Sequence, residues 1–327
     1  MLHTAEVPIE QEFELHRRAL TGYCYRMIGS GAEAEDAVQE TMVRAWKSAD
    51  KLQERGALKA WLFRIANNVC LDMLQSAQRR AQPMDLGPAS NADAPLGAPL
   101  AENAWVRPIA DARVVPEDAD PAEVAAQKET LRLAFVAALQ HLPPRQRAVL
   151  ILREVLRWQA TEVAELLDTS VASVNSALQR ARATIEELGL ESGGAASTVD
   201  DAEKKKLLAD YVALFESWDI SSLVKLVKHD AEFSMPPFPL WVRGPEQIEK
   251  FMLGPGAKCE NSKLIVTEAN GCPAVGLYNA DENGWAPWAI VVLEMSDGAI
   301  SGLHHFLYPE LFAEFGLPPR LDREHVS

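Results

Sequence analysis

The stretch TEVAELLDTSVASVNSALQRAR, residues 161–182, predicts two short helices joined by a tight turn. We expect a first helix over Thr161–Leu167, a turn over Asp168–Ser170, and a second helix capped by Ser170, whose hydroxyl can accept a bond from a free amide. A predicted buried stripe on the second helix follows steps of three and four residues, the spacing of one helical face. This stripe comprises Val171, Val174, Leu178, Ala181 and Ile185.

The opposite face of the second helix carries short polar or hydrogen-bonding side chains. They are Ala172, Ser173, Ser176, Gln179 and Arg180. Small residues let a helix enter the major groove of DNA, where Gln can pair with adenine edges and Arg with guanine or phosphate. The pattern indicates a helix-turn-helix that reads DNA, and a helical hairpin with a solvated polar face accounts for it equally well.

The charge of the chain limits what kind of DNA contact it can make. The 327 residues carry a net charge of −15, which disfavours a protein that coats nucleic acid through many phosphate contacts. With 48% hydrophobic residues, the chain is long enough for two or three globular domains. The four cysteines form no CxxC pair, and no segment predicts a signal peptide or a membrane span. We therefore expect a cytoplasmic protein without metal or cofactor.

The chain divides into three folded blocks and two linkers. Residues 1–82 and 123–190 show helical periodicity, which predicts two all-α domains. Between them, residues 83–122 are rich in proline and acidic side chains, and this composition predicts an extended or irregular linker without a packed core. A short linker over 191–201 precedes residues 202–327, where helices are followed by strand-like runs such as KLIVTEA and PWAIVVLEM. This last block predicts an α+β domain.

Three separated motifs over roughly residues 10–188 resemble the bacterial sigma factors of the extracytoplasmic function group. The motifs are AEAEDAVQETMVRAWK (32–47), KAWLFRIANNVCLDMLQSAQRR (59–80) and LPPRQRAVLILREVL (142–156) with its continuation EVAELLDTSVASVNSALQRARATIEEL (162–188). The resemblance implies a promoter-specificity subunit of RNA polymerase that binds the polymerase core, through the β′ clamp and the β flap, and promoter DNA. Asn175 and Ala177 depart from the family, in which many members have basic residues there.

The resemblance assigns a role to each helical motif. The helix over 32–47 is expected to dock on the β′ clamp through Asp36, Gln39, Glu40, Arg44 and Trp46. Taken alone, this helix favours a solvated charged face with Trp46 in the core. The minus 10 strand is expected to meet Lys59, Trp61, Arg64, Asn67, Asn68, Arg79 and Arg80. Trp61 also falls in an apolar stripe at helical spacing, which favours core packing for it; the stripe comprises Leu58, Trp61, Leu62, Ile65, Val69 and Met73. The minus 35 element is expected to meet Ser173, Asn175, Ser176, Gln179, Arg180 and Arg182.

The resemblance also gives the acidic linker two interpretations. Similar linkers thread along positively charged channels of the polymerase, and a plain tether explains the composition equally well. Within it, AWVRPIADA (104–112) is similar to a Trp/Pro/Asp motif of relatives with an extra C-terminal domain. Trp105 is therefore a candidate anchor onto that domain or onto the polymerase.

Residues 203–316 resemble the SnoaL-like branch of the nuclear-transport-factor-2-like superfamily, a cone of curved sheet and helices around a pocket. The candidate pocket residues are Asp230, Trp241, Trp288 and His304, with His229, His305 and Trp285 also considered. Catalysis is disfavoured, because the sequence shows no partner that would orient a general base. We expect a regulatory domain that contacts the sigma domains or their linker and takes an unknown small ligand.

The sequence thus predicts a non-enzymatic sigma factor whose activity is modulated by its fused C-terminal domain. Two other classes stay open at this point. One is an effector-responsive helix-turn-helix regulator that binds duplex DNA without polymerase. The other is a small-molecule isomerase or cyclase-like enzyme fused to a DNA-binding region.

Overall fold

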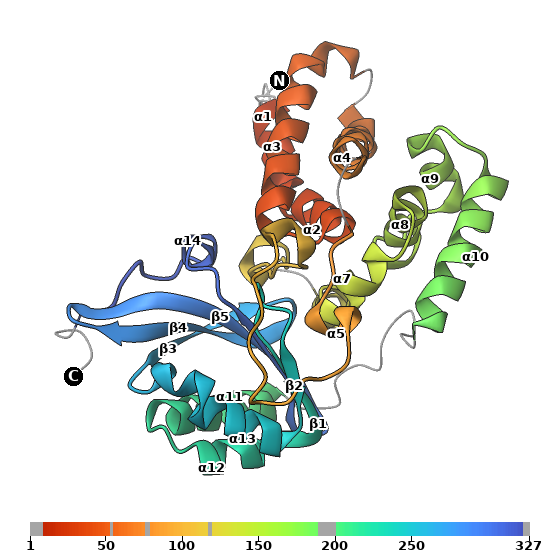
Figure 1. The fold of residues 1–327 in the computed structure, drawn as a ribbon. Coiled ribbons are helices and arrows are strands. Elements are labelled where there is room, and N and C mark those ends of the chain that lie inside the picture. Colours follow the sequence, from red (N-terminus) through yellow and green to blue (C-terminus); the bar gives the residue numbers. More distant parts are fainter. Residues whose placement is uncertain (1–8, 53–54, 76–78, 117–119, 189–200, 323–327) are drawn as a thin grey trace. The chain divides into compact units, whose positions relative to one another are not determined.

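The computed structural model describes residues 9–52, 55–75, 79–116, 120–188 and 201–322 (Figure 1). The chain forms two compact units. The helical unit comprises Met1–Arg79 and Ala112–Gly194, and the C-terminal unit comprises Arg80–Asp111 and Ala195–Ser327. The linker predicted over 191–201 lies outside the described residues apart from Asp201.

The first half of the helical unit is built from four helices. They are α1 (Ile9–Leu15), α2 (Arg17–Ile28), α3 (Gly31–Lys47) and α4 (Leu58–Leu74), with short 3₁₀ turns at η1 (Ala49–Lys51) and η2 (Arg55–Ala57). Helix α2 ends at Gly29, whose φ of 81° suits glycine, and Ser30 then caps α3 by accepting a bond from the Glu33 amide. Large side chains such as Tyr23, Leu62 and Phe63 fill the core between these helices.

The second half of the helical unit contains the helix-turn-helix. Its elements are α6 (Pro121–Glu129), α7 (Leu133–Gln140), α8 (Pro144–Leu150), the π-helical turn η5 (Ile151–Val155), α9 (Ala160–Leu166) and α10 (Val171–Glu187). The turn between α9 and α10 places Asp168 at a φ of 49°, and the Ser170 hydroxyl accepts a bond from the Ser173 amide at 3.1 Å. The predicted pair of helices and its serine cap are confirmed.

Two details of this pair differ from the sequence prediction. Val171, which was predicted to be buried, is 39% exposed. It is the first residue of α10, and the buried stripe begins one turn later at Val174. The first helix was predicted to reach Leu167, but α9 ends at Leu166, and Leu167 follows it half-buried.

Buried arginines join the two halves of the helical unit. Arg147 on α8 donates to Gln140 Oε1 at 2.7 Å, to the Leu142 carbonyl at 3.1 Å and to the Met27 carbonyl. Arg26 on α2 donates to Thr130 Oγ1 at 2.7 Å. Burial lowers the pKa of both arginines to about 10, so both stay charged at neutral pH.

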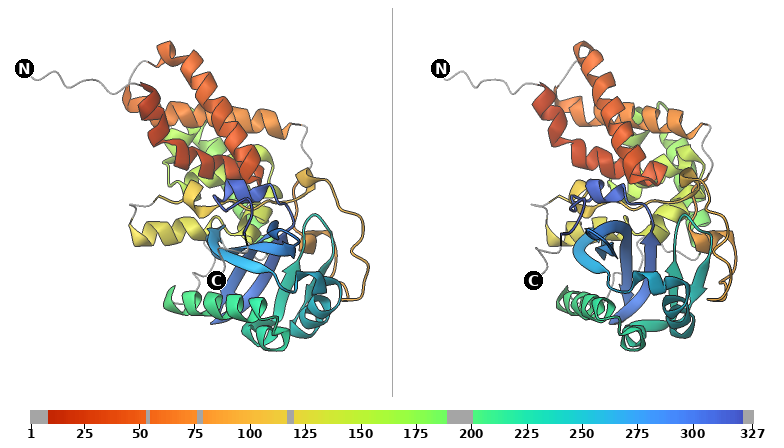
Figure 2. Two further views of the ribbon diagram at one scale, coloured as in Figure 1. Left: turned by 90° about the vertical axis from the view of Figure 1, so that its left-hand side faces the viewer. Right: turned by 60° about the vertical axis from the view of Figure 1, so that its left-hand side comes forward.

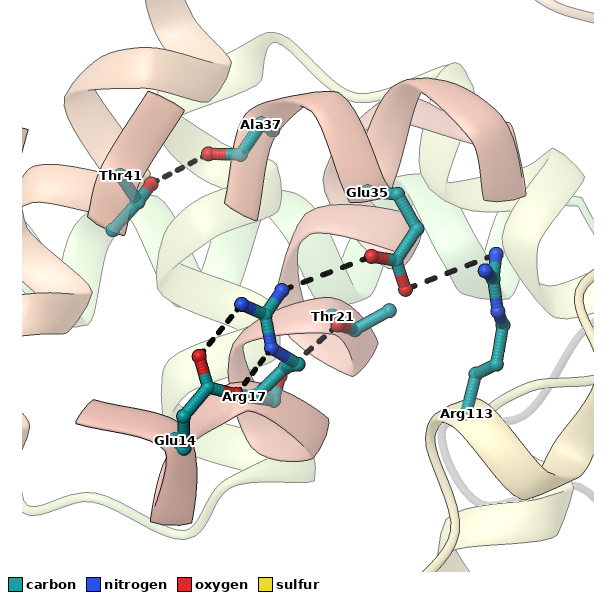
Figure 3. Close-up of polar contacts among 7 residues, drawn as sticks. All are labelled: Glu14, Arg17, Thr21, Glu35, Ala37, Thr41 and Arg113. Atoms are coloured by element: carbon teal, nitrogen blue, oxygen red, sulfur yellow. Dashed lines mark hydrogen bonds and ion pairs between the residues drawn. The ribbon is translucent and has the colours of Figure 1, made fainter. Parts of the chain in front are cut away.

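An ion-pair network fixes the residue at which the chain re-enters the helical unit. Figure 3 shows Glu35 of α3 between two guanidinium groups, with Arg17 at 4.0 Å and Arg113 at 3.8 Å. Arg17 also pairs with Glu14 of α1 at 2.6 Å. Arg113 is thereby held to α3 just after the linker.

The C-terminal unit contains a six-stranded sheet of order β2-β1-β6-β5-β4-β3, whose neighbours are antiparallel except for the parallel pair β1 and β6. The strands are β1 (Val227–Ser234), β2 (Trp241–Arg243), β3 (Lys263–Ala269), β4 (Cys272–Asp281), β5 (Gly284–Ser296) and β6 (Ala299–Phe306). The strand-like runs KLIVTEA and PWAIVVLEM fall in β3 and β5. The predicted α+β fold is confirmed.

Helices cover one face of this curved sheet, as Figure 2 shows for the C-terminal part of the chain. They are α11 (Asp201–Glu216), α12 (Ile220–Leu223), the 3₁₀ turn η6 (Val224–Leu226), α13 (Pro245–Leu253) and the 3₁₀ turn η7 (Pro255–Cys259). Helix α14 (Leu311–Glu314) follows the last strand. The core between sheet and helices includes Tyr211, Phe233, Ile248 and Leu293.

The acidic linker behaves differently from what its composition predicted. Residues 80–111 are called the linker segment below. The segment contains α5 (Pro83–Leu86) and the 3₁₀ turn η3 (Glu102–Ala104), and a further 3₁₀ turn, η4 (Asp111–Arg113), begins at Asp111, the last residue of the segment. Most of the segment is irregular, but Ala92, Trp105, Val106 and Ile109 are buried within the C-terminal unit. These apolar side chains are few among the prolines and acidic residues, so composition alone did not indicate that they are buried.

Backbone hydrogen bonds attach the linker segment to the sheet domain along its length. Ser90 donates to the Trp241 carbonyl at 2.8 Å and Leu100 to the Pro237 carbonyl at 2.9 Å. At the far end, Asn270 donates to the Ile109 carbonyl at 3.1 Å and accepts from the Ile109 amide at 3.0 Å. Because these bonds span the segment, it is a fixed part of the C-terminal unit.

Candidate nucleic-acid and polymerase interfaces

Helix α10 presents the predicted minus 35 residues to solvent. Ser173, Asn175, Ser176, Gln179 and Arg180 are all exposed. Val174, Leu178 and Ala181 pack inward, so the helix separates a buried stripe from a polar face. Arg182 is also exposed, but it forms an ion pair with Glu154 at 2.5 Å. The structure therefore places five of the six candidates together on one exposed face of α10.

Helix α4 carries the predicted minus 10 residues, and several of them contact other parts of the helical unit. Arg64 donates to the Glu165 carbonyl of α9 at 2.9 Å, and Lys59 lies 5.7 Å from the centre of the Trp158 ring. Arg79 is exposed and lies 3.0 Å from the Nδ1 atom of His141. These three side chains have the charge that DNA requires, but they are already engaged.

Two minus 10 candidates are buried rather than exposed. Asn67 is 2% exposed, and its Oδ1 atom accepts a hydrogen bond from the Tyr23 hydroxyl at 3.0 Å. Arg80 lies in the C-terminal unit, where it donates to the Trp105 carbonyl at 3.0 Å. Asn68, the neighbour of Asn67, is exposed. Of the two adjacent asparagines, therefore, only Asn68 presents its side chain at the surface.

Trp61 is half-buried, with its ring centre 6.3 Å from that of Phe13. This contact agrees with the core packing that the apolar stripe favoured. Trp158, which the sequence did not single out, is buried and lies 5.2 Å from the Phe63 ring. A tryptophan that precedes the helix-turn-helix by a few residues could have indicated this contact.

Helix α3 presents an acidic and apolar face. Trp46 is 63% exposed and Val43 is also exposed, so Trp46 is not the core residue that the helix alone favoured. Asp36, Gln39 and Glu40 are exposed on the same helix. Arg44 is bound to Glu40 at 2.7 Å and to Asp72 at 3.1 Å, and these carboxylates raise its pKa. This face combines apolar anchors with negative charge, as an interface with a basic partner requires.

The C-terminal unit encloses a cavity of about 320 Å³. Of the four pocket candidates, Trp288 lines it, whereas Asp230, Trp241 and His304 do not. Asp230 is exposed beside His229, the Trp241 indole donates to the Gly87 carbonyl at 2.9 Å, and His304 lies 2.9 Å from the Ser234 hydroxyl. His305 lines the cavity instead, because adjacent strand residues point to opposite faces.

The described residues include no helix long and apolar enough to cross a membrane. Within the same ranges, no cluster of His, Cys, Asp or Glu side chains could hold a metal ion.

Family models match both halves of the helical unit. Sigma-70 region 2 matches residues 13–80 and Sigma-70, region 4 matches residues 132–185. The helix-turn-helix on α9 and α10 falls in the second match, and helices α3 and α4 fall in the first. The fold and its two candidate faces thus define a sigma factor, which binds RNA polymerase core and promoter DNA.

Longer similarities extend over nearly the whole chain. The chain is 41% identical over 311 residues to the ECF RNA polymerase sigma factor SigG of Mycobacterium tuberculosis (strain ATCC 25618 / H37Rv), covering 94% of this chain and 83% of that protein. It is 28% identical over 323 residues to SigJ of the same strain, with 94% and 95% covered. The chain therefore belongs to the extracytoplasmic function RNA polymerase sigma factors, which are transcription initiation factors and not enzymes.

A solved structure supports the same fold. The crystal structure of the M. tuberculosis extracytoplasmic function sigma factor SigJ aligns with a TM-score of 0.61 at 24% identity, covering 94% of this chain and 99% of that chain. The likeness extends across the helical regions and the C-terminal α+β domain.

Proposed function

We propose that the C-terminal domain modulates promoter use by this sigma factor, and that it does so through the linker segment. The observation that carries the proposal is the attachment of residues 80–111 to the C-terminal domain. This segment is the covalent connection between the half that contains α4 and the half that contains α10. A segment held on a folded domain cannot lengthen as a free chain can.

Both ends of the linker segment are fixed close to the places where the chain changes unit. Asp111 accepts a bond from the Gly271 amide at 2.8 Å in the C-terminal unit, and Arg113 pairs with Glu35 in the helical unit. At the other end, Arg79 belongs to the helical unit and Arg80 to the C-terminal unit. Little free chain is therefore available between the two units while the segment stays attached.

Promoter recognition then requires α4 and α10 to bind two DNA elements at once. In the proposal, α10 reads the minus 35 element, while α4 captures the unpaired minus 10 strand through its exposed polar side chains. Arg64 and Lys59 contact the α9 end of the helix-turn-helix half, so these contacts must open before α4 meets DNA. Detaching the linker segment would supply the chain length for this separation.

The exposed face of α3 completes the proposal as the docking site for the β′ clamp. Replacing an exposed aromatic anchor typically costs about 2 kcal/mol or more of binding free energy while leaving the fold intact. We expect Trp46→Ala to weaken binding to core polymerase by roughly thirtyfold or more. Leu15→Ala, at an 80% exposed side chain on α1, is the control and should bind as the parent does.

The regulatory role is tested with a single substitution at the linker attachment. Asn270 has a φ of 55°, so Asn270→Gly keeps the backbone conformation and removes the side chain that accepts the Ile109 amide. The control is Asn261→Gly, at a residue with a φ of 66° whose backbone carbonyl accepts a bond from the Trp285 indole. Losing one such bond shifts the attachment equilibrium by roughly threefold to tenfold.

Run-off transcription with purified core polymerase provides the readout. We expect Asn270→Gly to raise transcript yield relative to the parent and to Asn261→Gly, because a loosened linker lets the two halves separate. Equal yields from all three proteins, with the attachment shown to be weakened by hydrogen exchange at Ile109, would refute modulation through the linker.

A further inference from the structure

The residues that line the cavity of about 320 Å³ all belong to the C-terminal unit, and most of them are apolar. The walls include the aromatic rings of Phe233 on β1, Phe251 on α13 and Trp288 on β5. Two further lining residues, Leu96 and Pro99, come from the linker segment. The volume falls at the lower end of the range for small-molecule pockets, which begins at about 300 Å³. The walls therefore suit the apolar body of a small ligand.

Of the described residues that line this cavity, Lys258 alone carries a charge at neutral pH. Two other lining side chains could ionise, but burial lowers the pKa of His305 to about 3 and raises the pKa of Cys259 to about 11. Both of these side chains are therefore neutral at pH 7. The same described lining contains no acidic residue. A charged group on a ligand in this cavity thus meets a cation and no anion.

Lys258 lies on η7, where the cavity lining meets solvent. Its side chain is exposed, and its Nζ atom lies 4.7 Å from the centre of the Trp288 ring. This cation–π contact holds the ammonium group against the wall of the cavity. A carboxylate that pairs with Lys258 can keep part of its hydration while an apolar body attached to it is buried. The ion pair then forms without the cost of moving both charges into the interior.

Lys258 differs in its partner from other lysines of the same domain. Lys228 pairs with Asp297 at 2.8 Å, and Lys263 pairs with Glu216 at 3.0 Å. Within the described ranges, no carboxylate forms an ion pair with Lys258, although the chain has 47 acidic residues against 32 lysines and arginines. The ammonium group is therefore available to an anion from outside the chain.

We propose that this cavity binds a small carboxylic acid with an apolar aromatic or aliphatic body, whose carboxylate pairs with the Lys258 ammonium group while the body lies among the aromatic walls. A cationic ligand is disfavoured, because Lys258 repels it, and a neutral ligand of the same shape lacks the ion pair. Leu96 and Pro99 of the linker segment also contact the bound acid, so the acid binds more tightly when the segment is attached. Any effect on transcription rests on the proposed function, but binding itself does not.

The test uses the full chain without polymerase, so that its outcome is separate from the outcome for transcription. The probes are 2-naphthoate, biphenyl-4-carboxylate and decanoate, with 2-naphthamide as the neutral match and 2-naphthylmethylammonium as the cationic match. Calorimetry gives their affinities for the parent and for three variants. We expect 2-naphthoate to bind the parent about fivefold more tightly than 2-naphthamide does, and the cation to bind more weakly still.

The variants separate the charge of Lys258 from the charge of the whole domain. Lys258→Met keeps an apolar stem beside Trp288 and should bind the acids about fivefold more weakly than the parent. Lys258→Arg keeps the charge and should retain the binding. Lys225→Met, at an exposed lysine on η6 outside the lining, removes the same charge and should bind as the parent does.

Two measurements on the parent protein locate the bound acid. In NMR of methyl-labelled methionine, protons of the bound acid should give Overhauser effects to Met235 and Met252, which line the cavity, and none to Met295, which is buried outside the lining. Hydrogen exchange at the Leu100 amide, which donates to the carbonyl of the lining residue Pro237, should slow when the acid binds.

The outcomes that would overturn the proposal are distinct. Failure of all three acids to bind the parent, equal affinities for 2-naphthoate and 2-naphthamide, or equal binding by Lys258→Met and the parent would each refute the carboxylate site. Binding without contacts to Met235 and Met252 would place the acid outside the cavity and refute it as well. Unchanged exchange at Leu100 would refute the coupling to the linker segment.

Discussion

Helices α4 and α10 are both seventeen residues long, and both carry predicted DNA contacts, but the structure presents them differently. The polar face of α10 is open, with Gln179 and Arg180 exposed. The polar side chains of α4 are divided between a buried asparagine, an exposed one, and cations that contact α9 or Trp158. In the proposed function, α10 can therefore meet duplex DNA as it stands, whereas α4 must first release its contacts with α9 and Trp158.

This asymmetry also explains how a chain of net charge −15 can act at promoters. The open face of α10 is narrow, and its described neighbours include acidic residues such as Glu186 and Glu187. Phosphate contacts supply most non-specific affinity for DNA, and this face offers few of them. In the proposed function, the polymerase supplies the remaining affinity and α10 selects the site.

The largest effect is expected from removing a buried arginine that joins the two halves of the helical unit. Arg147→Met removes a buried cation that bonds Gln140, Leu142 and Met27, and leaves their oxygens without this donor. We expect the helical unit to lose about 3 kcal/mol of unfolding free energy, measured by calorimetry. Arg145→Met, at an exposed position on the same helix, should lose almost none. Equal stability of the two variants would show that the arginine does not hold the halves together.

The next effect concerns the open face of α10. Arg180→Ala and Gln179→Ala should each reduce discrimination between the target promoter and a minus 35 variant by about 1–3 kcal/mol. Glu187→Ala, near the end of the same helix, should leave it unchanged. The measurement is competitive run-off transcription from the two promoters. Unaltered discrimination in both variants would remove α10 as the reader.

The two adjacent asparagines of α4, one buried and one exposed, are expected to have different roles. Asn67→Ala should lower stability by about 1–2 kcal/mol, because the buried Tyr23 hydroxyl loses its acceptor. Asn68→Ala should keep the stability and reduce open-complex formation, measured by permanganate reactivity of the melted strand. If Asn68→Ala melts promoters as the parent does, the exposed asparagine has no part in strand capture.

The smallest effect comes from adding charge to α10. Asn175 is exposed on the polar face of α10. Asn175→Lys should strengthen promoter binding by the holoenzyme roughly threefold at low salt and steepen its salt dependence by about one phosphate contact. A titration of binding against salt concentration checks both numbers. An unchanged slope would place residue 175 away from the DNA backbone.

The sequence predicted regular elements well where one pattern dominated. The stripe on 171–185 and the cap at Ser170 specified the helix-turn-helix, and runs of strand-like composition indicated β3 and β5. Composition misjudged the linker segment, because the few apolar residues that decide its packing, such as Trp105 and Ile109, are diluted by prolines and acids. Its partner surface lies on the C-terminal sheet domain, more than a hundred residues away in sequence.

Neighbouring residues of one chemical type were the hardest to separate from sequence. Asn67 and Asn68 have the same side chain, and only the position of Tyr23 in the fold buries one of them. His304 and His305 are both buried, but one bonds Ser234 and the other lines the cavity. Such assignments depend on tertiary contacts that a local pattern does not encode.

In the proposed function, α4 must separate from α9 before this sigma factor can open a promoter. It is tested by joining Arg64→Cys and Glu165→Cys with a short bis-maleimide crosslinker, since the Arg64 side chain contacts residue 165. The chain with Arg64→Cys alone, treated with the same reagent, controls for modification. We expect the crosslinked protein to fail to give run-off transcripts with core polymerase while the control stays active. Full transcription by the crosslinked protein would contradict it.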